Sequence, residues 1–407
     1  MTDYDTFLSH MGRQLHESAI RRMGTVVAKT HDLVSFAAGY PDPQGFPWDD
    51  LRAIASELLN GADGSVLQYG PTRGYRPLLE ALLGVLDTRG IRAPLDELMI
   101  TSGSQQGLDL IARVLVSPGD VVLVELPTYT GAIAAFKNMQ ASLAGVKQDE
   151  DGIDLADLDE VLRRERAAGR TVKLLYLVPN FQNPTGRLLG PGKRRRLVEW
   201  AETRNVLIVE DDPYGALYFD DVTTAGETRP IRADDARGRV IYLSTFSKTL
   251  APGFRVGWMV AAPALIERFD TAKQSVDLTS GILDQRVVLE AMRRGVPERI
   301  APQLRDLYRR KRDVMEQALR AELGGRLTWP APKGGFFLWA TLPEGQDDVS
   351  LLERALEQRL VFVIGSAFYV DGTGHDKIRL SFSAPAPERI VEGVRRLAGV
   401  LQPALTK

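Results

Sequence analysis

From about residue 95 onward, short runs of aliphatic residues alternate along the chain with segments of helical periodicity. An apolar run at 98–101 precedes a helical pattern at 105–116, and a second run follows at 121–125. Further runs of the same kind lie at 172–178, 206–210 and 240–244. Continuous apolar runs of this length are typical of strands buried on both faces, as in a mainly parallel sheet covered by helices. The alternation therefore predicts an α/β fold.

The pattern changes near residue 290. A helical segment at 302–323 has apolar residues along one side, and a closing helix is expected at about 386–402. Between them lie short strand-like segments at 335–339, 361–364 and 377–383. We predict a smaller α+β domain at 291–407, a large domain at 46–290, and an N-terminal arm at 1–45 that packs with the small domain.

Composition removes several classes of protein. The 407 residues include no cysteine, which excludes disulfides, thiolate nucleophiles and iron–sulfur clusters. The four histidines show no ligand-type clustering, so no metal is expected. A formal net charge of -2 argues against nucleic-acid binding. Neither a bilayer-spanning apolar stretch nor a secretory signal is present, so we expect no membrane partner and a cytoplasmic location.

A lysine with unusual neighbours follows the run at 240–244. Lys248 ends the segment Ser-Thr-Phe-Ser-Lys, and Arg255 comes seven residues later. The hydroxyls of Thr245 and Ser247, together with a guanidinium, are suited to hold a phosphate. A lone lysine is nearly always a surface residue, but cationic and desolvated surroundings depress a lysine pKa and make the amine a nucleophile toward an aldehyde.

Polar residues follow two other predicted strands. Asp211 and Tyr214 come after the run at 206–210, at the strand end where ligands bind in open α/β sheets. Asp211 is suited to keep a pyridine nitrogen protonated, and Tyr214 to face a ring oxygen; an acidic strand end that caps a loop is an equal alternative. Asn183, in an Asn-Pro-Thr-Gly segment after 172–178, is a donor for the same oxygen or part of a simple turn.

The segment between the run at 98–101 and the next helix is rich in glycine and serine. Gly103, Ser104 and Gln105 would present backbone N–H groups to an anion, helped by the helix dipole. Helix capping is the competing interpretation. Tyr129, past the following strand, would stack on a flat ring or belong to the core.

In this order, the segments resemble the class I/II aminotransferases, which are fold type I enzymes of pyridoxal 5'-phosphate (PLP). The resemblance covers nearly the whole chain and is most specific at 183–186, 211–214, 247–248, Arg255 and Arg379. It implies a large domain with a mainly parallel seven-stranded sheet, a smaller α+β domain, PLP as cofactor, and a homodimer with shared active sites.

The resemblance also implies roles for single residues. Lys248 would hold the cofactor as a Schiff base, the internal aldimine, and act as the base of the 1,3-proton shift. Asp211 would pair with the pyridinium nitrogen, Tyr214 and Asn183 would bond the ring oxygen, and Tyr129 would stack on the ring.

The remaining implied roles concern the phosphate and the substrate. The phosphate would be held by Gly103, Ser104, Gln105, Thr245, Ser247 and Arg255. Tyr69 would reach the phosphate of the neighbouring subunit. Arg379 would bind the substrate α-carboxylate as a bidentate clamp, a task that lysine performs poorly, with Asn183 beside it.

Within the class, the sequence is most similar to the branch of 2-aminoadipate and broad-range aminotransferases. The segments 68–71, 101–106, 181–186 and 332–335 carry that likeness. Arg21 lies on an arm that can reach the substrate pocket in this branch; a surface salt bridge is an equal alternative. Where the branch usually has Gly-Leu-Pro, this chain has Gly39-Tyr40-Pro41, so Tyr40 is expected to alter the pocket.

The expected activity is ping-pong exchange of an amino group between an L-amino acid and a 2-oxo acid such as 2-oxoglutarate, the donor being of the aminoadipate/glutamate, aromatic or branched type. A β-lyase, cyclising synthase or oxidase would share Lys248, Asp211 and Arg379, because PLP supplies the electron sink whichever bond breaks. A transcription regulator would need a DNA-binding module before residue 18, where the resemblance begins. An inactive scaffold is disfavoured by the intact Lys248 and Arg379.

Overall fold

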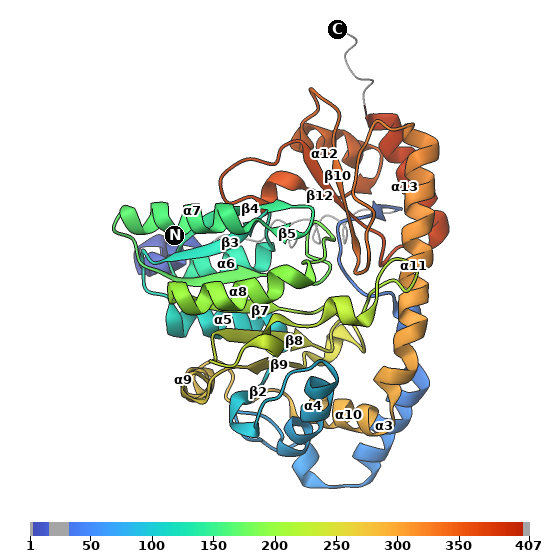
Figure 1. Cartoon of the computed structure of the whole chain (residues 1–407). Helices are drawn as coiled ribbons and strands as arrows, with labels where there is room; N and C mark the ends of the chain where they lie inside the picture. The colour runs from blue at the N-terminus through green and yellow to red at the C-terminus, as the bar shows by residue number, and fades with distance from the viewer. Residues whose placement is uncertain (1–2, 16–31, 402–407) are drawn as a thin grey trace.

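The computed structural model of the protein describes residues 3–15 and 32–401 (Figure 1). Its centre is an eight-stranded sheet with the strand order β2-β9-β8-β7-β6-β3-β4-β5. The strands are β2 (Leu98–Thr101), β3 (Val121–Leu126), β4 (Ser142–Asp149), β5 (Gly152–Ile153), β6 (Val172–Leu177), β7 (Leu207–Asp211), β8 (Val240–Thr245) and β9 (Gly257–Val260). The pairs from β8 through β7, β6 and β3 to β4 are parallel, whereas β9 runs antiparallel between β2 and β8. The predicted α/β class and mainly parallel sheet are confirmed, with the two-residue β5 as an additional edge strand.

Alternate residues of the central strands enter two separate apolar cores, one on each face of the sheet. In β3, Val122 and Val124 belong to one core and Val121 and Leu123 to the other. This is the period of two expected of a strand, and it explains why the sequence runs are apolar throughout. The first core includes residues of α5 (Gly103–Leu115), α6 (Thr130–Asn138) and α9 (Pro263–Gln274), and the second includes residues of α7 (Leu155–Ala167) and α8 (Pro191–Arg204).

Helices α3 (Trp48–Asn60), α4 (Arg76–Thr88) and α10 (Ile282–Arg293) pack together beyond the β2 edge of the sheet. From there α11 (Val296–Leu323) runs along one side of the molecule to α13 (Pro387–Val400), as Figure 1 shows. Helix α11 begins six residues before the expected start at 302. Pro297 occupies its first turn, and Pro302 lies inside the helix. Proline is well tolerated in the first turn of a helix, and here that proline is Pro297, whereas the helix continues through Pro302 in its interior.

The C-terminal part contains a three-stranded antiparallel sheet of β10 (Phe337–Thr341), β13 (Lys377–Ser381) and β12 (Val363–Ile364), with α12 (Asp348–Glu357) and α13 beside it. β1 (Val34–Ser35) pairs in parallel with β11 (Leu360–Val361), so the chain after residue 32 lies against the C-terminal part. The division at residues 45 and 290 stays a prediction. Among the described residues, no helix has the length and apolarity needed to cross a bilayer.

Candidate active site

A cavity of about 210 Å³ lies at the carboxyl ends of the parallel strands, where open α/β sheets bind their ligands. β7 ends in Asp211, β8 ends in Thr245, and Val178 follows β6. The walls of the cavity are formed by Gly39, Tyr40, Ser104, Gln105, Tyr129, Val178, Asn183, Asp211, Pro213, Tyr214, Thr245, Ser247, Lys248, Arg255, Phe337 and Arg379. Residues from eight separate segments of the sequence are thus brought to one place.

Lys248 lies in the turn directly after β8 and projects its amine into this cavity. The Nζ atom donates a hydrogen bond to the Gly39 carbonyl at 3.0 Å and lies 5.7 Å from the centre of the Phe336 ring. Burial lowers the lysine pKa to about 8, and the positive charges of Arg255 and Arg379 act in the same direction. The amine is therefore neutral in a useful fraction of molecules near neutral pH, as a nucleophile toward an aldehyde requires.

Asp211 presents a buried carboxylate to the cavity. Its Oδ2 atom accepts a hydrogen bond from the Tyr176 hydroxyl at 3.1 Å, while Oδ1 is buried and has no hydrogen-bond partner among the described residues. Burial raises the pKa of this carboxyl to about 7, and the neighbouring Asp212 charge adds to that effect. A buried acceptor without a donor is rare and calls for an explanation. A protonated pyridine nitrogen would supply both the donor and the positive charge.

Another part of the cavity wall has the features of an anion site. Arg255 donates to Ser247 Oγ at 3.3 Å and to the Ser102 carbonyl at 3.1 Å, and the hydroxyls of Thr245 and Ser247 are 2.8 Å apart. Helix α5 begins here at Gly103, whose φ of 70° suits glycine, and a Cβ on it would come within 2.5 Å of the Arg255 guanidinium. Hydroxyls, a guanidinium and the free N–H groups of a helix start are together suited to a phosphate.

Arg379 comes from β13 and is only 1% exposed. It donates to Asn183 Oδ1 at 2.7 Å and to the Ala37 carbonyl, and its guanidinium lies 4.3 Å from the centre of the Phe337 ring. Its Nε atom is buried and has no partner in the part of the chain that is described. Burial lowers the pKa of this arginine to about 10. A guanidinium with an unused donor on the cavity wall is suited to bind a carboxylate.

Two tyrosines complete the arrangement. Tyr214 is buried, stands edge-on to Phe336 and Phe337 at 5.5 and 5.9 Å between ring centres, and burial raises its pKa above the usual value. Tyr129 precedes α6 and lies with its hydroxyl 3.4 Å from Gln105 Oε1. Together with Asn183, these side chains can face a flat aromatic ring.

Two of the described residues named from the sequence do not line the cavity. Gly103 lies behind the Arg255 guanidinium, and Tyr69 is 78% exposed on the surface. Arg21 lies outside the described residues. Sequence reasoning in turn missed the wall residues Val178, Pro213 and Phe337 and the Asp211 partner Tyr176.

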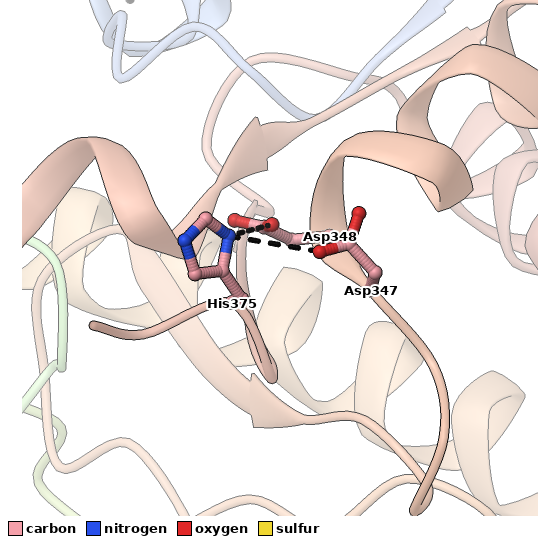
Figure 2. A group of neighbouring side chains, drawn as sticks. All are labelled: Asp347, Asp348 and His375. Atoms are coloured by element: carbon pink, nitrogen blue, oxygen red, sulfur yellow. Dashed lines mark hydrogen bonds and ion pairs between the residues drawn. The ribbon is translucent and has the colours of Figure 1, made fainter. Parts of the chain in front are cut away.

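A second group of ionisable side chains lies apart from the cavity, at the start of α12 (Figure 2). His375 Nδ1 is 3.1 Å from Asp348 Oδ1 and 3.6 Å from Asp347 Oδ2. The fold already employs both carboxylates, because Asp347 caps α12 and Asp348 accepts bonds from the backbone and hydroxyl of Ser366. We therefore assign no metal to this group.

A reactive lysine, an anion site and a buried carboxylate with one oxygen left without a donor lie around one cavity at the strand ends of the sheet, and together they define a PLP-dependent enzyme of the fold type I class. The comparisons with known proteins agree. The sequence profile of the family described as aminotransferase class I and II matches residues 32–397. The chain is 39% identical over 407 residues to the aromatic-amino-acid aminotransferase 1 of Thermococcus litoralis, spanning all of this chain and 96% of that protein.

Two further relatives are of interest. The chain is 40% identical to the 2-aminoadipate transaminase of Thermus thermophilus over 91% of its own length and 90% of the relative's. It matches the solved structure of Pyrococcus horikoshii kynurenine aminotransferase, described as a complex with PMP, with a TM-score of 0.92, 39% identity and 98% coverage of both chains. The chain therefore belongs to the aminotransferase class I and II family. It is a PLP-dependent aminotransferase, and the predicted family, enzyme class and cofactor are confirmed.

Proposed function

We propose that the enzyme accepts L-amino acids with aromatic or large apolar side chains and passes their amino group to a 2-oxo acid, with 2-oxoglutarate as the expected acceptor. The observation that carries the proposal is the aromatic wall formed by Tyr40 and Phe337, next to Arg379, which is suited to bind a carboxylate. Aromatic walls favour flat apolar groups through large contact areas. The aromatic and kynurenine aminotransferases named above support the same donor class.

The residues of the cavity have complementary roles in this proposal. Asp211 would hold the pyridine nitrogen in its protonated form through Oδ1, with Tyr176 orienting the carboxylate from the other side. Tyr214 and Asn183 would bond the ring oxygen, and Tyr129 would stack on the ring. The phosphate would be held by Ser104, Gln105, Thr245, Ser247 and Arg255, with Gly103 behind them allowing the start of α5 to come close to Arg255.

When bound, PLP supplies the electron sink that makes the α-proton of an amino acid removable. Lys248 would carry that proton, because an amine with a pKa of about 8 can accept it and give it back near neutral pH. Arg379, held by Asn183 and the Ala37 carbonyl, would fix the α-carboxylate in one orientation. Such fixed orientation is what brings the α-carbon within reach of the lysine.

We also propose a homodimer in which Tyr69 reaches the phosphate of the partner subunit. Leu67 and Tyr69 are 74% and 78% exposed, and Val276 and Leu278 are also exposed. The two segments lie side by side, since the Thr279 hydroxyl donates to the Pro71 carbonyl at 3.3 Å. Four exposed apolar side chains in neighbouring segments support an interface at this face. The cytoplasmic location stays a prediction.

A second donor class is 2-aminoadipate, favoured by the 40% identity to the Thermus thermophilus 2-aminoadipate transaminase. Its distal carboxylate would require a further cation. Lys248, Arg255 and Arg379 would already serve the α-proton, the phosphate and the α-carboxylate. Arg21 remains the candidate for that cation.

A half-reaction separates these possibilities. Holoenzyme would be mixed with a single L-amino acid and no oxo acid, while the cofactor's absorption spectrum and mass are followed. We expect conversion to pyridoxamine phosphate with phenylalanine, tyrosine and leucine at rates at least tenfold above those with 2-aminoadipate. Faster conversion with 2-aminoadipate would contradict the donor class. Consumption of donor while the cofactor stays in its aldehyde form would indicate a β-lyase, synthase or oxidase reaction.

A further inference from the structure

Residues 36–42, here named the strap, pass along the cavity wall, and their backbone carbonyls are bonded one after another by other parts of the fold. The Phe36 carbonyl accepts from Ser381 N at 2.8 Å, and the Gly39 carbonyl accepts from the Lys248 amine at 3.0 Å. The Tyr40 carbonyl accepts from Ser383 Oγ at 2.7 Å. The position of the strap therefore decides where the Tyr40 side chain, 59% exposed at the cavity, is placed.

The strap ends at a buried ion pair between Asp42 and Lys311 of α11, whose side chains are only 7% and 2% exposed. The Lys311 amine also donates to the Ser383 carbonyl at 2.8 Å, and Asp42 N donates to the Tyr308 hydroxyl at 3.1 Å. Ser383 is thus shared, because its carbonyl bonds Lys311 while its hydroxyl bonds the Tyr40 carbonyl. One cation on α11 ties together the strap end and the residue that holds Tyr40.

Burying two charges costs so much desolvation that an ion pair of this kind adds little net stability. Its neighbour along the helix, Arg310, pairs with Asp306 on the exposed face of α11. Lys311 is therefore distinguished by its position and not by its charge. The best-attested role of a buried ion pair is to fix one conformation of the chain where several are possible.

We propose that the Asp42–Lys311 pair is a positioning device, which holds the strap so that Tyr40 closes the wall of the donor pocket and thereby selects large amino donors. The inference deepens the proposed function and rests on its donor class. The strap lies tightly against the opposite wall, because a Cβ on Gly39 would come within 2.7 Å of the Phe337 ring. Loss of the anchor would let the strap move away from Phe337 and widen the pocket.

The test compares Lys311→Met with Arg310→Met, a matched control that removes the neighbouring cation of the same helix without touching the strap. The first readout is the ratio of kcat/KM for phenylalanine to kcat/KM for alanine, whose methyl group is too small to use the pocket wall. We expect this ratio to fall about tenfold in Lys311→Met, the scale at which a pocket distinguishes apolar side chains. We expect it to stay within about twofold of wild type in Arg310→Met.

The second readout is hydrogen exchange of the peptide that contains residues 36–42 in the holoenzyme, measured by mass spectrometry without any donor. Faster exchange in Lys311→Met and unchanged exchange in Arg310→Met are expected. Since Lys311→Met leaves the Asp42 charge buried and unpaired, it can fail to fold. The double variant Asp42→Asn/Lys311→Met leaves no such charge, and it should show the same loss of donor preference and of protection.

Three results would overturn the proposal. The first is unchanged hydrogen exchange of the strap in the double variant, and the second is faster exchange with an unchanged phenylalanine/alanine ratio of kcat/KM. The third is an equal loss of kcat/KM for both donors that matches the loss of folded protein. The proposed function fails separately, if wild-type enzyme does not turn over phenylalanine. The ratio is then taken between the largest and the smallest donors that wild type accepts, and together with the exchange data it still decides the role of the pair.

Discussion

At the scale of the residue, we expect turnover to depend most on the amine of Lys248. Replacement by alanine should lower the half-reaction rate by a factor of at least about 10² to 10⁴, because the acid–base group that carries the α-proton is removed. The measurement is single-turnover conversion of cofactor with phenylalanine. Lys147→Ala, which removes an exposed lysine on β4, is the control and should have wild-type rates. A Lys248→Ala rate within tenfold of wild type would refute the assignment.

Asp211 makes the stability of the apoenzyme depend on pH. Its pKa of about 7 in the folded protein exceeds the value of 3.8 for an unperturbed carboxyl. Between these values the folded chain holds a proton that the unfolded chain has lost, so the free energy of unfolding falls as pH rises. One such group contributes a slope of up to about 1.4 kcal/mol per pH unit.

Asp211→Asn should therefore flatten the pH dependence between pH 4 and 7, as urea unfolding of wild-type and variant apoenzyme would measure. Glu353→Gln removes an exposed carboxylate on α12 and should leave the slope unchanged. An Asp211→Asn variant with the wild-type slope would show that burial of this carboxylate is not the cause. Glu125 and Glu210, whose pKa values burial also raises to about 7, would keep a residual slope in both proteins.

The location of single residues at the cavity was predictable where residue type and position after a strand agreed. Lys248, Asp211 and Asn183 follow strands and line the cavity, as their places in the sequence suggested. Arg379 lines it too, but it lies within β13 and was named only from the family resemblance. Phe337 did not stand out, because a buried aromatic residue in a strand has the same pattern whether it faces a cavity or the core. The same holds for Tyr176 and Val178, and only the folded arrangement separates them from core residues.

At the scale of the element, the start of α5 has to approach the Arg255 guanidinium closely. Gly103→Ala places a Cβ within 2.5 Å of that group at a residue with φ of 70°. We expect PLP affinity of the apoenzyme to fall at least about tenfold, because strain of about 1–2 kcal/mol at a left-handed residue is released by moving the anion site. Fluorescence titration of apoenzyme with PLP measures the effect.

The matched control for that variant is Gly84→Ala in the interior of α4, where an added Cβ meets no atom within 4 Å. It should leave PLP affinity unchanged and raise stability by roughly 0.5–1 kcal/mol, because alanine is the better helix former. Equal PLP affinity in Gly103→Ala and Gly84→Ala would contradict the assignment of the anion site to the α5 start.

Element boundaries followed the sequence where the apolar pattern was continuous. β3, β6 and β8 coincide with apolar runs because both of their faces are buried. β4 had no such signal, since it is a strand near the sheet edge in which buried and exposed residues alternate irregularly. Its pairing with β3, and not its own sequence, identifies it as a strand.

At the scale of the whole molecule, the most consequential contacts join segments that are far apart in sequence. Asp42 meets Lys311, and Arg379 meets both Ala37 and Asn183. No periodicity within one segment can predict such pairs, because they depend on how α11 and β13 are placed against the central sheet. The substrate side of the cavity was therefore the part least accessible from the sequence.

The exposed Leu67 and Tyr69 lead to a prediction about assembly. Leu67→Asp should weaken the proposed homodimer at least about tenfold, because dimerisation would bury an unpaired carboxylate. Sedimentation equilibrium would detect the shift from twice the chain mass of 44.9 kDa toward the single chain. Val349→Asp, at a 40% exposed residue on α12, is the control and should leave the mass unchanged.

Tyr69→Phe then separates the interface from the cofactor contact that it is proposed to provide. Removing only the hydroxyl should leave the dimer mass unchanged but weaken PLP binding roughly tenfold, because a hydrogen bond to a charged group contributes about 1.5–3 kcal/mol. Dimers of Leu67→Asp, formed at high protein concentration, should bind PLP as wild type does. If Tyr69→Phe retains wild-type PLP affinity in the dimer, the phenol does not reach the partner's phosphate, and the two active sites are complete without it.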